Sequence, residues 1–159
     1  MSSVRRARLD DVPVVLQLIK ELATYEREPD AVVATEEMLR DILFGPEPKV
    51  FCHVAEDDAG SVVGFAMWFV NFSTWLGTHG IYLEDLFVRP GVRGGGYGRA
   101  LLQELARIAV ENGYGRIDWA VLDWNEPAQG FYAALGATPQ DDWTGWRLTA
   151  GALRALSER

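Results

Sequence analysis

The most constraining feature of this sequence is a glycine-dense segment, Arg93-Gly94-Gly95-Gly96-Tyr97-Gly98, between a strand-like run and an amphipathic helix pattern. Glycine permits positive φ angles and lets bare backbone approach a ligand. The N–H groups at the start of the following helix favour a bound anion. The segment therefore predicts a phosphate-binding loop, and a tight turn without a ligand is the alternative.

Two common nucleotide-binding motifs do not fit this segment. A P-loop needs Lys and then Ser or Thr after its last glycine, but Arg99 and Ala100 stand there. A dinucleotide fingerprint that begins at Gly94 needs glycine at position 99, which is arginine. The loop therefore predicts a phosphate group without naming a nucleotide.

The periodicity on both sides of the loop predicts a single α/β domain over residues 1–159. Val15, Leu18, Ile19 and Leu22 fall on one face of a helix that should run to about Glu26. The remaining elements give the order β-αα-β-β-β-α-β-α-β. We expect strands at 4–9, 50–55, 62–72, 81–88, 117–122 and 143–148, and further helices after Thr35, over 99–112, after Asn125 and over 150–157.

Composition excludes several classes of function. The net charge of −8 is opposite to the basic balance of nucleic-acid-binding proteins, so we expect no nucleic-acid partner. No apolar run approaches the ~20 residues that cross a bilayer, so we expect no membrane partner and a cytoplasmic location.

The cysteine and histidine content argues against a metal or thiol centre. One cysteine, Cys52, allows no internal disulfide, and with His53 and His79 it cannot build a Cys-rich zinc site. Adjacent strand residues point to opposite faces, so Cys52 and His53 cannot act as a catalytic pair. We expect Cys52 in the core, both histidines on the surface or satisfied as polar groups, and no metal, with a carboxylate-bound Mg²⁺ left open.

Two carboxylates, Glu84 and Asp85, interrupt the apolar run at 81–88. A carboxylate in such a strand is costly unless it meets solvent or a site. Strand alternation places the two on opposite faces unless a bulge intervenes. Each could instead pair with an arginine.

The pattern Arg93-x-x-Gly96-x-Gly98 resembles the acyl-CoA signature [Q/R]-x-x-G-x-[G/A] of the GNAT acetyltransferases. Four further blocks resemble the diamine (spermidine/spermine) and thialysine N-acetyltransferases of that superfamily: 18–26 (LIKELATYE), 81–88 (IYLEDLFV), 124–132 (WNEPAQGFY) and 145–148 (GWRL). The resemblance implies the GNAT fold, with a central mixed, mostly antiparallel sheet flanked by helices.

The resemblance implies acetyl-CoA as co-substrate and no metal. It places the cofactor on backbone of Leu86, Phe87 and Val88, on Arg93, Gly94, Gly95, Gly96, Tyr97, Gly98 and Arg99, and on Asn125, Glu126, Pro127, Ala128 and Tyr132. Arg89, Arg93 and Arg99 can hold an anion against the net negative charge. Asn125 would be needed as a helix cap in any case.

Catalysis, by the same resemblance, is direct attack of an amine in a ternary complex. A primary amine with a pKa of ~10.4 is protonated at neutral pH, so a group must take its proton. Glu84 matches the family's base, and Tyr132 matches the tyrosine that protonates the thiolate. Ordinary aromatic packing beside Phe131 is the alternative role for Tyr132.

The resemblance also indicates a small cationic amine acceptor and a homodimer, with 143–148 as a contact or exchange element. The acceptor residues implied are Tyr25, Glu26, Glu84, Asp85, Asp118, Trp119, Ala120, Thr144 and Trp146. Thr144 stands where the polyamine enzymes have an acid, with Asp141 and Asp142 slightly upstream, which argues against long polyamines and leaves shorter amines, thialysine and amino-acid amines open. A non-catalytic acyl-CoA sensor and an acetyltransferase of protein lysines or N-termini are the alternative functions.

Overall fold

The computed structural model describes residues 3–158, so the first two residues and the last one of the expected domain lie outside the described part. The chain forms two compact units, 1–120 and 121–159. The first contains β1 (Ser3–Arg6), η1 (Leu9–Asp11), α1 (Val12–Tyr25), α2 (Glu36–Phe44), β2 (Val50–Glu56), β3 (Val62–Ser73), β4 (Thr78–Val88), η2 (Pro90–Val92), α3 (Tyr97–Glu111) and β5 (Ile117–Asp118). The second contains α4 (Glu126–Ala134) and α5 (Ala150–Ser157).

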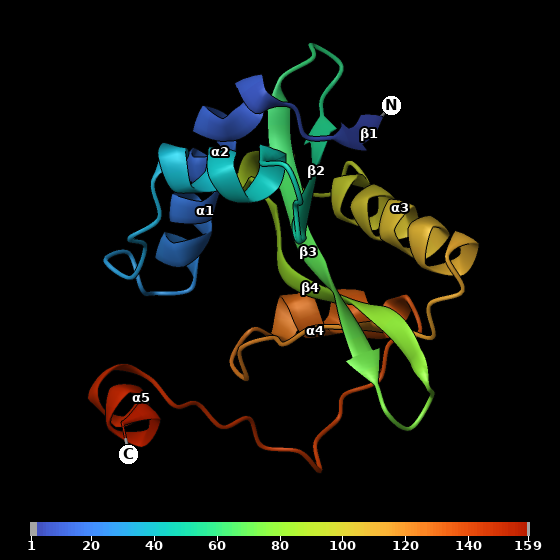
Figure 1. The fold of residues 1–159 in the computed structure, drawn as a ribbon. Coiled ribbons are helices and arrows are strands. Elements are labelled where there is room, and N and C mark those ends of the chain that lie inside the picture. Colours follow the sequence, from blue (N-terminus) through green and yellow to red (C-terminus); the bar gives the residue numbers. More distant parts are fainter. Residues whose placement is uncertain (1–2, 159) are drawn as a thin grey trace. The chain divides into compact units, whose positions relative to one another are not determined.

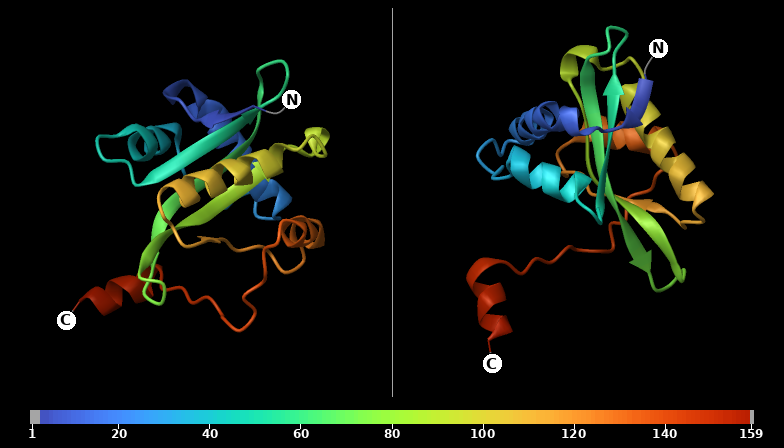
Figure 2. Two further views of the ribbon diagram at one scale, coloured as in Figure 1. Left: turned by 90° about the vertical axis from the view of Figure 1, so that its right-hand side faces the viewer. Right: turned by 45° about the horizontal axis from the view of Figure 1, so that its top comes forward.

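The first unit is built on a five-stranded sheet in the order β1-β2-β3-β4-β5. The first four strands are antiparallel, and β5 runs parallel to β4, so the sheet is mixed as expected. Figure 1 shows α1 and α2 on one side of β2 and β3, with α3 on the other side. Figure 2 shows the same arrangement from two further directions.

The apolar stripe of α1 forms the core between the helices and the sheet, as its spacing predicts. Val15 and Leu18 have no exposed surface, and Leu22 is buried beside them. They pack with side chains from one face of the sheet: Cys52, Val54, Phe65, Met67 and Phe87. Full burial of a side chain of this size contributes roughly 1.5–3 kcal/mol, so this face holds α1 against β2, β3 and β4 of the sheet.

Cys52 and His53 point to opposite faces of β2, as the alternation predicts. Cys52 is in the core, where burial raises the pKa of its thiol to about 12. His53 is buried under α3 and accepts a hydrogen bond on Nδ1 from Trp68 Nε1 at 3.1 Å. The thiol is thus held as an inert core group, and the histidine is a satisfied polar group.

The expected strand at 117–122 is wrong beyond its second residue. Only Ile117 and Asp118 pair, with Ile81 and Tyr82 of β4. A run of β-forming residues becomes a strand only where a partner satisfies its backbone, and no described strand continues beside residues 119–122.

The expected last strand at 143–148 is also wrong: none of the described strands pairs with these residues, which lie in an exposed segment without regular secondary structure. The exposed fraction of Trp143 is 70% and that of Trp146 is 95%. The helix expected at 150–157 is present with the expected bounds.

Candidate active site

The glycine loop leads into α3 without a side-chain cap. Gly94 and Gly96 have φ angles of +93° and +81°, in the left-handed region that glycine tolerates. Gly96 is the N-cap of α3 and has no side chain to accept the first free N–H groups. A Cβ at either position would meet nothing within 4 Å, so the backbone here is open to an external group. The free backbone N–H groups at the start of α3 carry partial positive charge and are accessible from outside. They therefore fit the phosphates of coenzyme A.

The edge of β4 opposite β3 is open beyond Tyr82. β5 covers this edge only at Ile81 and Tyr82. No other strand of residues 3–158 adjoins it. The open stretch therefore offers unpaired backbone groups to an extended ligand that carries amides.

The hydrogen-bond alternation of β4 determines which residues face that edge. Arg89 N donates to Val63 O at 2.9 Å, so Arg89 faces β3. Successive residues of an antiparallel strand alternate toward and away from the partner, so Phe87 also directs its backbone to β3. Leu86 and Val88 direct theirs to the open edge, where Arg93 Nε donates to Val88 O at 3.1 Å.

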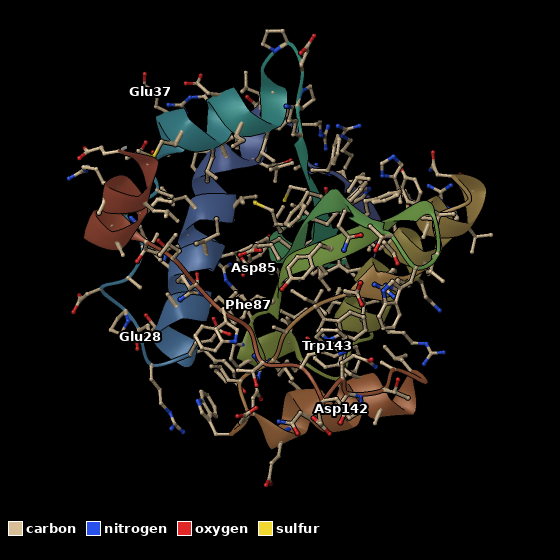
Figure 3. The ribbon with its side chains drawn as sticks, turned by 60° about the horizontal axis from the view of Figure 1, so that its bottom comes forward. Glu28, Glu37, Asp85, Phe87, Asp142 and Trp143 are labelled. Atoms are coloured by element: carbon tan, nitrogen blue, oxygen red, sulfur yellow. The ribbon has the colours of Figure 1, made fainter. Side chains whose placement is uncertain are left out.

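A bulge at Glu84 resets the side-chain alternation of β4. Leu83 lies opposite Trp68 and Asp85 opposite Met67, so Glu84 is an extra residue in the ladder. Asp85 shares its face with Met67 and Phe87, which face α1, and Figure 3 shows Asp85 and Phe87 beside α1. The bulge is the exception that the sequence left open, and it places both carboxylates close enough to interact.

The carboxylates of Glu84, Asp85 and Glu26 form an acidic cluster. Burial, and then the negative charges of Glu84 and Glu26, raise the pKa of Asp85 to about 6. Burial also raises the pKa of Glu26. Within residues 3–158, none of the three forms an ion pair with an arginine, the alternative considered for Glu84 and Asp85. An uncompensated group of this kind attracts a cation.

The end of α1 positions Tyr25 and Glu26 at this cluster. Arg27 takes a left-handed φ of 68°, and Glu28 N donates to Ala23 O at 2.8 Å, which closes a Schellman-type cap. The Arg93 guanidinium lies 4.8 Å from the centre of the Tyr25 ring. The glycine loop and the expected acceptor wall are therefore joined through one cation–π contact.

The three arginines expected at the anion site differ in their partners. Arg89 Nε and Nη2 donate to the two oxygens of Glu21 at 3.0 and 2.9 Å. Arg93 contacts Tyr25 and Val88, as described above. Arg99 is exposed and has no ion pair among residues 3–158, so it is the arginine available to a phosphate.

The acidic cluster extends toward β5. Asp118 lies opposite Tyr82 in the sheet and accepts a hydrogen bond from Arg116 Nε at 3.0 Å. Burial and the charges of Glu84 and Asp118 raise the pKa of the Tyr82 phenol. Trp119 is half-buried and Ala120 is exposed, and no group of acidic, histidine or cysteine residues in the described part could hold a metal ion.

The second unit carries the remaining expected site residues. Asn125 is buried, and its side chain accepts a hydrogen bond from Ala128 N at 3.4 Å, which caps α4 as expected. Tyr132 lies on α4, half-buried, with its ring 5.5 Å from that of Phe131. Both alternatives for Tyr132, proton donor and packing residue, are compatible with this environment. Thr144 and Trp146 lie in the exposed segment that follows.

Sequence reasoning missed a pocket of about 370 Å³ beside Tyr25 and Phe87. Its polar wall is formed by Gln17, Lys20, Glu21 and Thr24, which recur at helical spacing along α1. This polar stripe is visible in the sequence beside the apolar one. On its own it is typical of any solvated helix face.

Comparison with known proteins identifies the chain's relatives. The model of the acetyltransferase (GNAT) family matches residues 15–137. A thialysine N-epsilon-acetyltransferase of Bos taurus is 38% identical, over 97% of this chain and 96% of its own. An L-ornithine N5-acetyltransferase of Arabidopsis thaliana is 31% identical, over 99% of this chain and 88% of its own.

A similar solved structure is an integron cassette protein from the mobile metagenome of V. cholerae. Its TM-score is 0.79 and its identity 28%, over 99% of this chain and 98% of that one. A membrane-spanning helix is not found among the described residues.

Proposed function

This chain belongs to the GNAT acetyltransferase family, and on that premise we propose that it acetylates a primary amine of a small cationic acceptor. It is an N-acetyltransferase that uses acetyl-CoA. The proposal names the acceptor as a diamine, a polyamine, thialysine or a lysine-like amine. The names of the thialysine and ornithine relatives support this class.

The observation that carries the proposal is the acidic cluster of Glu26, Glu84 and Asp85 beside the open edge of β4. Burial first, and then repulsion from Glu84 and Glu26, raise the pKa of Asp85 to about 6, and a cationic amine relieves that repulsion. The same carboxylates can take the proton that the amine must lose before it attacks. A carboxylate whose pKa lies near 6 is a better proton acceptor at neutral pH than an ordinary aspartate.

The residues proposed to hold acetyl-CoA are the glycine loop, the start of α3, Arg99, and the backbone of Leu86 and Val88. Bound there, acetyl-CoA supplies an activated thioester. Backbone N–H groups at the edge of β4 are proposed to polarise its carbonyl. In the second unit, Asn125 to Ala128 at the start of α4 are proposed as further cofactor contacts, because the block 124–132 resembles that of the related acetyltransferases.

Tyr132 is proposed to donate a proton to the departing thiolate, because a phenol is protonated at neutral pH. We expect Tyr132→Phe to lower kcat by about 100-fold, the scale of a lost general acid, with little change in coenzyme A binding. Tyr114→Phe is a matched control, since Tyr114 packs against His79. Unchanged turnover of Tyr132→Phe would leave this residue a packing role only.

The acceptor is tested by thiol release from acetyl-CoA with putrescine, spermidine, lysine, thialysine and a short lysine peptide. Turnover of one small-amine group, with loss in Tyr132→Phe, supports the proposal. Preference for the peptide would identify a protein acetyltransferase instead. Coenzyme A binding without turnover of any acceptor would favour a sensor.

The wider proposal is a single acetyltransferase domain made of both compact units, since the family match at 15–137 spans their boundary. We propose a homodimer in which 143–148 contacts the second copy, because Trp143 and Trp146 are largely exposed in this chain. Sedimentation as a monomer at micromolar concentration would contradict the dimer.

We also propose a cytoplasmic location, which cell fractionation tests. We propose no nucleic-acid partner and no membrane partner, which pull-down experiments test.

A further inference from the structure

Two residues that line the pocket beside α1 are close in sequence to residues of the acidic cluster. Tyr25 lines the pocket and precedes Glu26, while Phe87 lines it and lies two residues from Asp85 on the same face of β4. Residues two apart on a strand are separated by about 6.6–6.8 Å. The Phe87 wall of the pocket therefore lies about 7 Å along β4 from the Asp85 backbone.

The charge of the pocket is opposite to that of the cluster. Glu21 is neutralised by the two hydrogen bonds from Arg89, at 3.0 and 2.9 Å, and its pKa is lowered by them. Lys20 is exposed on the pocket wall and has no ion pair with any of residues 3–158. Among the side chains that line the pocket, the uncompensated charge is thus the positive charge of Lys20, and the Arg93 guanidinium over the Tyr25 and Phe87 rings adds a second positive charge nearby.

Two polar side chains flank Lys20 on the pocket wall. Gln17 and Thr24 stand one helical turn to either side of it on α1, and both line the pocket. The Thr24 hydroxyl donates its proton to Lys20 O at 3.1 Å, and the Gln17 amide hydrogen-bonds Glu21 and leaves one of its two N–H groups, so the donors that remain for a carboxylate are the Lys20 ammonium and one N–H of Gln17. The volume of about 370 Å³ is at the lower end of ligand pockets, which suits a small metabolite.

We propose that this pocket binds the α-carboxylate of a basic amino acid through Lys20, while the side-chain ammonium lies at Glu26, Glu84 and Asp85. The inference rests on the proposed acetylation of a small cationic amine and narrows its substrate class. A molecule with a carboxylate at one end and an ammonium at the other matches both charges. A diamine leaves Lys20 without a partner and places its second ammonium beside it.

The test compares each amino acid with its decarboxylated diamine: lysine with cadaverine and ornithine with putrescine. We expect the wild-type enzyme to have a higher kcat/KM for each amino acid than for its diamine. Lys20→Met should lower kcat/KM for lysine and ornithine by about 10- to 100-fold, the scale of a charge-assisted hydrogen bond. It should leave kcat/KM for cadaverine and putrescine within about twofold or raise it, because repulsion is removed.

The chain contains a matched control, since its only other lysine is Lys49, which is exposed on the loop before β2. Lys49→Met should leave both substrate classes unchanged. Lys20→Arg should retain most of the higher kcat/KM for amino acids over diamines, because it keeps the positive charge. The KM for acetyl-CoA should not change in any of the three variants.

Three results would overturn the inference. These are equal loss for amino acids and diamines in Lys20→Met, a raised KM for acetyl-CoA in that variant, or wild-type turnover of diamines alone. The second result would assign the pocket to a phosphate of coenzyme A, and the third leaves the proposed acetylation intact. Calorimetric titration of lysine and cadaverine separates the two proposals further. Binding of lysine that depends on Lys20, without acetylation, would support the pocket and overturn the proposed function.

Discussion

Replacing Asp85 by asparagine should stabilise the folded protein at pH 8 while lowering its acetyltransferase activity. Burial is the largest cause of the raised pKa of Asp85, followed by the charges of Glu84 and Glu26. The folded pKa is above the ordinary value of 3.8, so the folded state binds this proton more tightly than the unfolded state does. The contribution of the protonated Asp85 carboxyl to the free energy of unfolding is therefore complete below pH 3.8 and is lost as the pH rises through about 6.

The magnitude follows from the difference between these two pKa values. A rise from 3.8 to about 6 corresponds to about 3 kcal/mol of folding free energy lost on ionisation at pH 8. Asparagine removes that charge but keeps a buried polar group, which itself costs free energy. We therefore expect the free energy of unfolding of Asp85→Asn to exceed that of the wild type by about 1–2 kcal/mol at pH 8.

Urea denaturation of both proteins at pH 8 and pH 4.5 measures this difference. At pH 4.5 the wild-type carboxyl is largely protonated, so most of the gain should disappear. Asp30→Asn, at an exposed position after α1, controls for loss of one negative charge. If Asp85→Asn changes the free energy of unfolding equally at both pH values, or lowers it at pH 8, then Asp85 is not a charged carboxylate without a compensating partner.

The same carboxyl should appear in the activity of the wild-type enzyme. We expect kcat/KM for the amine to fall on the acid side with an apparent pKa near 6. Glu84→Gln should move that pKa downward, because it removes one of the two negative charges that raise it. An acid limb that stays in place in Glu84→Gln would assign the titration to another group.

Two further predictions concern Arg93 and His53. Arg93→Met should raise the KM for both acetyl-CoA and the amine several-fold, because Arg93 contacts both the Tyr25 ring and the carbonyl of Val88. Steady-state kinetics measures both KM values. The comparison variant is Arg99→Met, which should raise the KM for acetyl-CoA alone. Burial lowers the pKa of His53 and a proton on Nδ1 would displace Trp68 Nε1, so the contribution of His53 to the free energy of unfolding should fall as the pH drops below 6.5, the ordinary pKa of histidine, opposite in sign to the contribution of Asp85. In urea denaturation, the free energy of unfolding of the wild type minus that of His53→Gln should fall between pH 7.5 and pH 5.5, and a constant difference would exclude His53 as a cause of the pH dependence.

Several elements could be predicted because their signals are local. The apolar spacing of Val15, Leu18 and Leu22 predicts the buried face of α1, and Thr35 predicts the start of α2, where its hydroxyl accepts a hydrogen bond from Met38 N at 3.2 Å. The glycines of the loop predict positive φ angles, which Gly94 and Gly96 adopt. Propensity, capping and steric limits act within a few residues, so one stretch of sequence is enough to reveal them.

The pairing of strands could not be predicted in the same way. Residues 117–122 and 143–148 have strand-like composition, yet of these residues only Ile117 and Asp118 pair in the sheet. The bulge at Glu84 likewise depends on the register between β3 and β4. Register is set by contacts between residues far apart in the chain, which local propensity does not contain.

The sequence by itself determined the helices, the glycine loop with its positive φ angles, and the acidic residues within the run 81–88. Tertiary structure decided how those groups meet: the bulge brings Glu84 to Asp85, the end of α1 adds Glu26, and the short β5 leaves Leu86 and Val88 at an open edge. It also decided that Lys20, on an ordinary polar helix face, lines a pocket beside Tyr25 and Phe87. The reason is that the charge, burial and access of a side chain depend on neighbours that only packing supplies.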